Sequence, residues 1–167
     1  MNQIKLLYIS KTGFTKQYAS YLASKLNIEA QEYKKGSGLN KNDNIIFCSF
    51  VFGGNITGLS DIRNEVDEKN IWVLACGISS SSTEVINRLA KENHFDSNRL
   101  YYAPGGIDYA KLNFLKKSIL KMIKNNLEKK EKRSFEEEEI LRRLTIGGSF
   151  VDFSYCDSLI KEVLNER

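Results

Sequence analysis

The chain has 167 residues, enough for one domain that buries roughly two-thirds of the surface its unfolded form would expose. Its three cysteines lie far apart without a CxxC pair, and His94 has no cysteine or histidine neighbour at ligand spacing, so we expect reduced thiols and no metal site. A net charge of +4, spread along the chain, does not indicate nucleic-acid binding.

Five short apolar runs, rich in β-branched or aromatic residues, predict strands. They cover residues 4–9, 28–33, 44–52, 70–76 and 99–104. The first run is too short for a signal sequence or a membrane span, so we expect a soluble, cytoplasmic protein.

Segments with helical periodicity separate most of these runs. One apolar stripe comprises Tyr18, Tyr21, Leu22 and Leu26, and another comprises Val85, Ile86, Leu89 and Ala90. Residues 34–43 contain glycines and polar residues, so the helix there is expected to be short or missing. Alternation of strands and helices predicts an α/β fold with a doubly wound, five-stranded parallel sheet.

The remainder of the chain is predicted to be largely helical. From residue 109 one face would carry Leu112, Leu115, Ile119, Met122 and Ile123, with lysines elsewhere. A second helix is expected over residues 135–144, paired glycines would end it, and an amphipathic helix would close the chain over 155–164. We expect one domain over residues 1–167, with a helical insertion near the C-terminus.

The segment SKTGFT, residues 10–15, stands between the first strand and the first helix. Ligands of open α/β sheets bind beyond the carboxyl ends of the strands, and a helix N-terminus favours an anion. Ser10, Thr12 and Thr15 offer hydroxyl donors, while Gly13 allows close backbone approach or a positive φ. The pattern favours a phosphate-binding loop over simple helix capping, which needs only one hydroxyl.

The sequence does not match the motifs of other phosphate-binding loops. Neither GxxxxGK nor GxGxxG follows the first strand. Ser49 stands where a phosphorylated response regulator needs a carboxylate, and Ser82 stands where a cysteine phosphatase built on Cys76 needs an arginine.

The S-x-T-G-x-T pattern resembles the FMN phosphate loop of flavodoxins. The resemblance implies a flavodoxin-like sheet with strand order 2-1-3-4-5. It also implies that the phosphate is held by Ser10, Lys11, Thr12, Gly13, Phe14 and Thr15.

The same resemblance places the flavin ring beside the loops after the third and fourth strands. Those segments are Phe50, Val51, Phe52, Gly53 and Gly54, followed by Gly77 and Ile78. Phe50 or Phe52 would lie against the isoalloxazine, although either can equally be a buried strand end. Beyond them, Ser81 and Glu84 are expected to form a capping box for the next helix.

APGGIDYAKLNFLKKSILKMI after the fifth strand, together with TIGGSFVDFSYCDSLIKEV, is similar to the flavodoxin-like, menaquinone-dependent protoporphyrinogen oxidases. By that resemblance Gly105, Gly106, Asp108 and Tyr109 border the cofactor, although Asp108 can equally cap a helix.

The resemblance implies an FMN-dependent oxidoreductase whose partner is a redox protein or a quinone. The lysine-rimmed helix over residues 111–125 raises the prospect of peripheral membrane contact. Two alternatives stay open, namely an electron carrier without its own substrate and a binding module that has lost its flavin.

Overall fold

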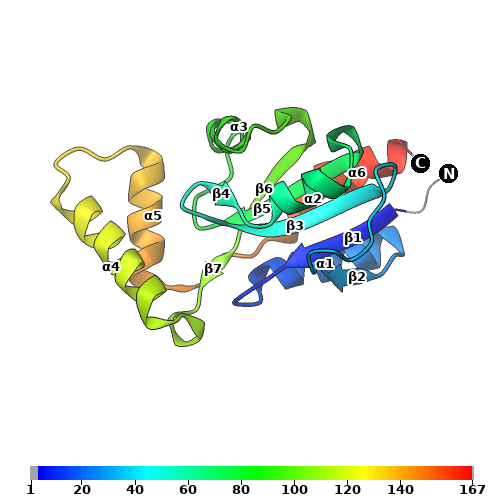
Figure 1. Cartoon of the computed structure of the whole chain (residues 1–167). Helices are drawn as coiled ribbons and strands as arrows, with labels where there is room; N and C mark the ends of the chain where they lie inside the picture. The colour runs from blue at the N-terminus through cyan, green and yellow to red at the C-terminus, as the bar shows by residue number, and fades with distance from the viewer. Residues whose placement is uncertain (1–3, 167) are drawn as a thin grey trace.

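The computed structural model describes residues 4–166, and its centre is a parallel sheet flanked by helices (Figure 1). The parallel strands are β1 (Ile4–Ile9), β2 (Ala30–Glu32), β3 (Asn44–Phe52), β5 (Ile71–Gly77) and β6 (Leu100–Pro104). Their spatial order is β2-β1-β3-β5-β6, which confirms the predicted five-stranded parallel arrangement.

Strand pairing is in register along the middle of the sheet, where Leu7 lies beside Phe47 and Phe47 beside Val73. One additional strand, β4 (Asn55–Ile56), pairs antiparallel with the end of β3. The turn between them is Gly53-Gly54, with φ of 57° and 81°. Glycine tolerates positive φ at both turn positions, as a tight hairpin requires.

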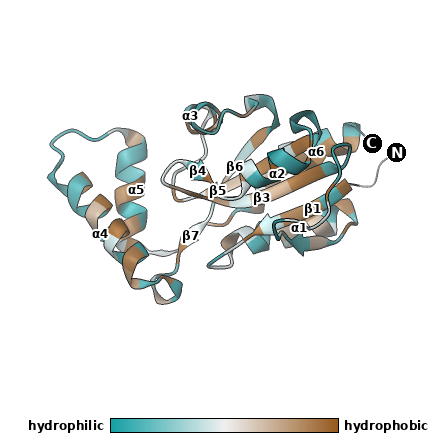
Figure 2. Ribbon diagram, viewed as in Figure 1, coloured by the Kyte–Doolittle hydropathy of each residue, from teal (hydrophilic) through white to brown (hydrophobic). Residues whose placement is uncertain are grey.

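Each face of the sheet packs against a pair of helices. The helices of the domain body are α1 (Phe14–Leu26), α2 (Leu59–Glu65), α3 (Thr83–Glu92) and α6 (Asp157–Asn165). Side chains alternate along β3, so Phe47 packs toward α2 and α3 while Ile46 packs toward α1 and α6. The strands are therefore apolar along their length, and the outer surface of α2 is polar (Figure 2).

The connection between β2 and β3 contains no helix among the described residues, as the glycines of residues 34–43 predicted. The Tyr33 hydroxyl instead donates to Glu65 on α2 at 2.7 Å. This part of the sheet is therefore covered partly by side chains of the neighbouring crossover.

A helical hairpin extends beyond the sheet, formed by α4 (Phe114–Lys129) and α5 (Phe135–Ile146). It lies at the opposite end of the sheet from the start of β1 and the end of α6 (Figure 1). A two-stranded ladder connects it to the body, because β7 (Gly106–Ile107) pairs antiparallel with β8 (Gly148–Ser149).

The predicted apolar face of α4 was partly wrong. Leu112, just before the helix, and Ile119 and Ile123 within it face inward as expected, but Leu115 is 67% exposed and Met122 is 56% exposed. Lys116, which was expected to lie off the apolar face, lines the cavity together with these residues. The 16-residue helix carries apolar residues on two sides, and its packing against α5 decides which side turns inward.

Short 3₁₀ turns connect the elements at Glu68–Asn70, Ser97–Arg99, Tyr109–Lys111 and Phe153–Cys156. The C-terminal helix α6 follows the last turn. Glu162 of α6 accepts hydrogen bonds from Trp72 and Tyr101, which anchors the helix to the sheet. Within residues 4–166 the structure contains no helix whose length and apolar character suit a membrane crossing.

Candidate functional site

A cavity of about 500 Å³ opens at the carboxyl ends of β1, β3, β5 and β6. The strands β1 and β3 are parallel neighbours, so their carboxyl ends lie at the same edge of the sheet. The connection that follows β1 leads to β2 on one side, and the connection that follows β3 leads to β5 on the other. Such a reversal in strand order separates two loops and leaves a crevice between them. The fold therefore brings the segments that follow β1, β3, β5 and β6 to one cavity.

The loop after β1 forms one end of the cavity. Gly13 adopts φ 98°, and its amide donates to the Ser10 hydroxyl at 3.1 Å. Lys11, Thr12, Phe14 and Thr15 line the cavity, whereas Ser10 and Gly13 shape the loop behind them. The positive φ at Gly13 turns the chain sharply into α1, which directs the first helical amides toward the cavity.

The N-terminus of α1 has no side-chain cap among the described residues. The helices α3, α4 and α5 differ in this respect, since Ser82, Asn113 and Ser134 each accept a hydrogen bond from the first turn. The α1 amides and the positive end of the helix dipole therefore stay available to an external acceptor.

Thr15 lies at the base of this loop and is only 3% exposed. Its hydroxyl hydrogen-bonds to Cys76 at the end of β5. Burial raises the pKa of the Cys76 thiol to about 12, and the contact with Thr15 offsets only part of that rise. Cys76 is therefore a neutral thiol at neutral pH and forms part of the cavity floor.

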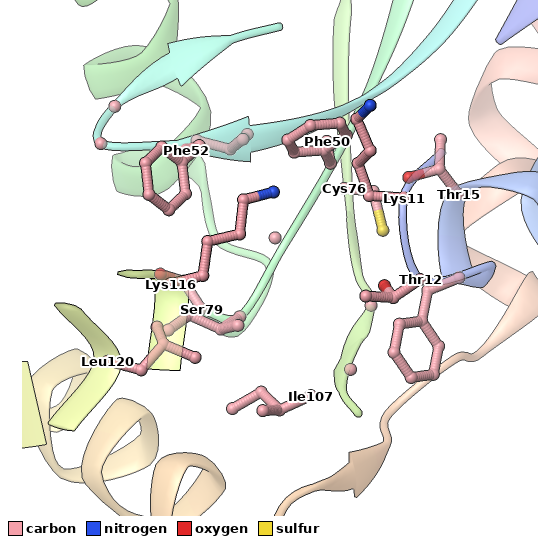
Figure 3. Close-up of a pocket in the computed structure, with 18 of the residues that line it drawn as sticks. Lys11, Thr12, Thr15, Phe50, Phe52, Cys76, Ser79, Ile107, Lys116 and Leu120 are labelled. Carbon is pink, nitrogen blue, oxygen red and sulfur yellow. The ribbon is translucent and has the colours of Figure 1, made fainter. Parts of the chain in front are cut away.

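The end of β3 forms a second wall through Phe50, Val51, Phe52, Gly53 and Gly54. The Lys116 ammonium lies 5.4 Å from the centre of the Phe50 ring and 5.6 Å from that of Phe52 (Figure 3). An ammonium over aromatic rings is stabilised electrostatically. The two phenylalanines thus face the hairpin across the cavity.

The loop after β5 contributes Gly77, Ile78 and Ser79 to the lining. Arg143 of α5 reaches this loop and donates to the carbonyl oxygens of Ile78 and Ser79 at 2.9 and 2.8 Å. A charged donor fixes the backbone of the loop more firmly than a neutral one. The hairpin therefore holds the loop in place.

The expected capping box of Ser81 and Glu84 was wrong. The cap of α3 is Ser82, whose hydroxyl accepts from Val85 at 3.2 Å. The Ser81 hydroxyl instead donates to the Tyr102 carbonyl at 3.1 Å, because the loop runs one residue farther before the helix begins.

The segment after β6 closes the remaining side. Gly105 donates to Gly77 at 2.7 Å, which joins the loops after β5 and β6. A Cβ at Gly106 would lie 2.5 Å from both the Gly148 carbonyl oxygen and the Phe14 ring, so the close approach requires glycine.

The structure separates the two polar residues predicted beyond these glycines. Asp108 lines the cavity, accepts from the Ala110 amide at 3.1 Å and pairs with Lys111 at 3.5 Å. Tyr109 is not part of the lining, and its hydroxyl donates to the Leu144 carbonyl at 2.5 Å. The capping role of Asp108 is confirmed for the short 3₁₀ turn, and its contact with a cofactor stays a prediction.

Sequence reasoning missed the hairpin wall and the α3 wall. The hairpin wall comprises Leu112, Lys116, Ile119, Leu120 and Ile123, and the α3 wall comprises Val85, Arg88, Leu89 and Glu92. The α4 signal was the i, i+4, i+7, i+8 spacing that includes Lys116, which a purely apolar count overlooks. Within residues 4–166 there is also no cluster of potential metal ligands.

The fold and the cavity define a doubly wound α/β domain in which the loop after β1 and a helix N-terminus without a side-chain cap lie at the point where strand order reverses. A family model described as a flavodoxin domain matches residues 5–134. The chain belongs to this flavodoxin-domain family.

Individual relatives are distant. A crystal structure named "Putative flavoprotein from Bacteroides uniformis ATCC 8492" is 13% identical, covering 62% of this chain and 87% of its own, with a TM-score of 0.38. A second, named "hypothetical protein", is 12% identical, covering 98% of this chain and 71% of its own, with a TM-score of 0.33. No curated protein matches the chain. Neither structural similarity is high enough to carry an argument of its own.

Proposed function

We propose that the protein binds FMN and works as a flavin-dependent redox protein. The observation that carries this proposal is the uncapped N-terminus of α1, which opens on the cavity beside the hydroxyls of Thr12 and Thr15. A phosphate monoester fits such a cradle, because its oxygens accept hydrogen bonds only and its charge suits the helix dipole. Membership of the flavodoxin-domain family agrees with this proposal.

The fit extends to the rest of the cavity. Phe50 and Phe52 offer aromatic surface, and the loop at Gly77 and Ile78 offers backbone groups. Ser10 would hold the loop turn through its bond to the Gly13 amide, and Lys11 would add a cation at the phosphate. Bound FMN supplies electron transfer, while the chain binds it, orients it and limits water around it.

An oxidoreductase resembling the protoporphyrinogen oxidases is the preferred form of this function. The hairpin supports it, because Leu120 lies on the side of the cavity away from Thr12 and Thr15 (Figure 3), and Ile123 of the same helix also lines the cavity. A covered, apolar space suits the binding of a small reactant such as a quinone. An electron carrier needs instead an open surface on which a redox partner protein can dock. The electron carrier remains the alternative, and salt-sensitive reduction by a flavodoxin reductase without turnover of small substrates would favour it.

The test titrates the FMN-free protein with FMN and with riboflavin, which lacks the phosphate. We expect FMN to bind more tightly than riboflavin. The double variant Thr12→Val/Thr15→Val should weaken FMN binding by several kcal/mol, because each hydrogen bond to a charged group contributes about 1.5–3 kcal/mol. Riboflavin affinity should change little. Thr145→Val is the control, since that threonine lies on α5 and donates to Leu141.

Equal affinity of the unmodified protein for both flavins would refute the phosphate-binding role of the loop. An assay of the FMN-loaded protein with protoporphyrinogen and a menaquinone analogue then separates the oxidase from the carrier. Turnover supports the oxidase, and its absence together with reductase-driven reduction supports the carrier.

A further inference from the structure

The hairpin wall carries a cation that the phosphate-binding role does not use. Lys116 projects into the cavity between Phe50 and Phe52, whereas Lys11, Thr12 and Thr15 stand toward the other side (Figure 3). Within the described part of the chain, the Lys116 ammonium has no carboxylate within ion-pair distance. Two turns farther along α4, Lys124 pairs with Glu128 at 3.9 Å.

The carboxylates that line the cavity are committed elsewhere or lie apart from Lys116. Asp108 pairs with Lys111 at 3.5 Å. The Glu92 carboxylate lies against the backbone of Gly54, at 2.6 Å from where a Cβ would be. Of the two other described cations that line the cavity, Lys11 belongs to the loop after β1, and Arg88 is engaged with Glu136 through two bonds of 2.7 Å.

Lys116 is half-buried, and its ammonium lies over the Phe50 and Phe52 rings. Leu112, Ile119, Leu120 and Ile123 line this end of the cavity. A cation in such surroundings interacts strongly with an anion, because less water screens it than at an open surface. Apolar walls with one placed polar group are the usual composition of a small-molecule site.

We propose that the hairpin end of the cavity is a second binding compartment, which takes an apolar aromatic molecule bearing one anionic group and pairs that group with Lys116. This compartment shares the Phe50 and Phe52 wall with the proposed FMN site and, within the proposed function, would hold the molecule that exchanges electrons with the flavin. The assignment rests on the proposed function for its role, but the binding itself can be tested without FMN.

The test uses two fluorescent probes of nearly identical shape. One is 1-anilinonaphthalene-8-sulfonate, which is anionic, and the other is N-phenyl-1-naphthylamine, which lacks the sulfonate. Equilibrium dialysis measures both probes on the full chain, with and without saturating FMN. We expect the anionic probe to bind in a 1:1 ratio in the presence of FMN, and Lys116→Met to weaken it about 10-fold, as loss of one charge-assisted contact predicts. The neutral probe should be unaffected.

Matched variants separate the compartment from the outer surface. Lys117→Met alters the next, exposed lysine and should change neither probe, while Lys116→Arg should restore most of the anionic affinity. Leu120→Ser should weaken both probes because Leu120 lines the cavity, whereas Met122→Ser should weaken neither because Met122 is 56% exposed.

Two results would overturn the proposal. One is that each bound FMN displaces one molecule of the anionic probe, which would mean that the flavin fills the whole cavity. The other is an unchanged preference for the anionic probe in Lys116→Met. If FMN does not bind at all, the proposed function fails, and the FMN-free measurements on Lys116→Met still decide whether this compartment exists.

Discussion

The guanidinium of Arg143 donates to the carbonyl oxygen of Ser79 at 2.8 Å, which joins the helical hairpin to the loop after β5. Arg143 is only 7% exposed and also stacks over Phe150, with 4.8 Å between the guanidinium carbon and the ring centre. Its Nε has no hydrogen-bond partner within residues 4–166, although Glu139 lies 3.8 Å away. One buried side chain therefore joins the helical hairpin to a loop that lines the cavity.

Replacement of Arg143 by Met should loosen the hairpin. The Ile78 and Ser79 carbonyls would lose charged donors worth about 1.5–3 kcal/mol each, partly replaced by water, so we expect unfolding to become easier by about 2 kcal/mol. Amide hydrogen exchange in α5 and in residues 78–80 should accelerate. Arg142→Met is the control because Arg142 is exposed and contacts Glu139 on its own helix. Equal effects of the two variants would contradict the linking role.

Replacement of Gly13 by Ala should weaken FMN binding more than it destabilises the fold. A side chain at φ 98° costs about 1–2 kcal/mol, and relief of that strain would rotate the amides at the start of α1 away from the phosphate. Isothermal titration should show a loss of FMN affinity and little change for riboflavin.

Gly36→Ala is the matched control for that strain. Gly36 has φ 77°, and no described atom lies within 4 Å of a Cβ placed there. The control should show a similar loss of stability in urea unfolding with unchanged FMN affinity. A loss of FMN affinity in both variants would indicate that general destabilisation, rather than loop geometry, is responsible.

Attachment of the hairpin to α3 should depend on pH through Glu136. The hydrogen bonds from Arg88 hold the pKa of Glu136 below its usual value, despite partial burial. A carboxyl with a lowered folded-state pKa contributes stability above its unfolded pKa of about 4.3, and loses it as the pH falls through the folded value. The protection factors of the α5 amides against hydrogen exchange, which correct for the pH dependence of the intrinsic exchange rate, should therefore fall below about pH 4.

Glu136→Gln tests this dependence. The variant should exchange faster at pH 7 and respond less to acid than the unmodified protein. Glu128→Gln is the control, because Glu128 pairs with Lys124 on the same helix at 3.9 Å. An acid response of unchanged size in Glu136→Gln would assign the effect to other carboxyls.

The cysteines should resist alkylation in the folded protein. All three are buried, and burial raises the pKa of Cys76 and Cys156 to about 12 and that of Cys48 well above its usual value. The thiolate is the reactive form, so iodoacetamide should modify the folded chain very slowly between pH 7 and 9. Mass spectrometry should show three rapid modifications once urea unfolds the protein. Rapid modification of Cys76 in the folded state would contradict its buried, neutral character.

The parallel sheet was predictable because its strands are buried on both faces and read as continuous apolar runs. The prediction for β3 coincides with residues 44–52 of the structure. The antiparallel β4 was not predicted, since two residues after Gly53-Gly54 are too few to show a periodicity. The loop between β1 and α1 was predictable from hydroxyls and glycine at a topologically defined position.

The hairpin contribution to the site was not predictable in the same way. In the sequence, Lys116 falls outside the predicted apolar face of its helix, and nothing distinguishes Arg143 from the neighbouring Arg142. Their inward positions depend on how α4 and α5 pack against each other and against the body. Sequence periodicity specifies that a helix has a face, but tertiary contacts choose the face.

The ladder between β7 and β8 brings the two ends of the hairpin segment together, with Gly106 paired to Ser149 and Ile107 to Gly148. The polypeptide leaves the sheet domain and re-enters it at adjacent points, so the intervening stretch is topologically a detachable module. A tight two-residue reverse turn could join the two strands directly. Evolution, or an engineer, could thus exchange this module for another of different length and chemistry and leave the parallel core and the loop at Gly13 in place.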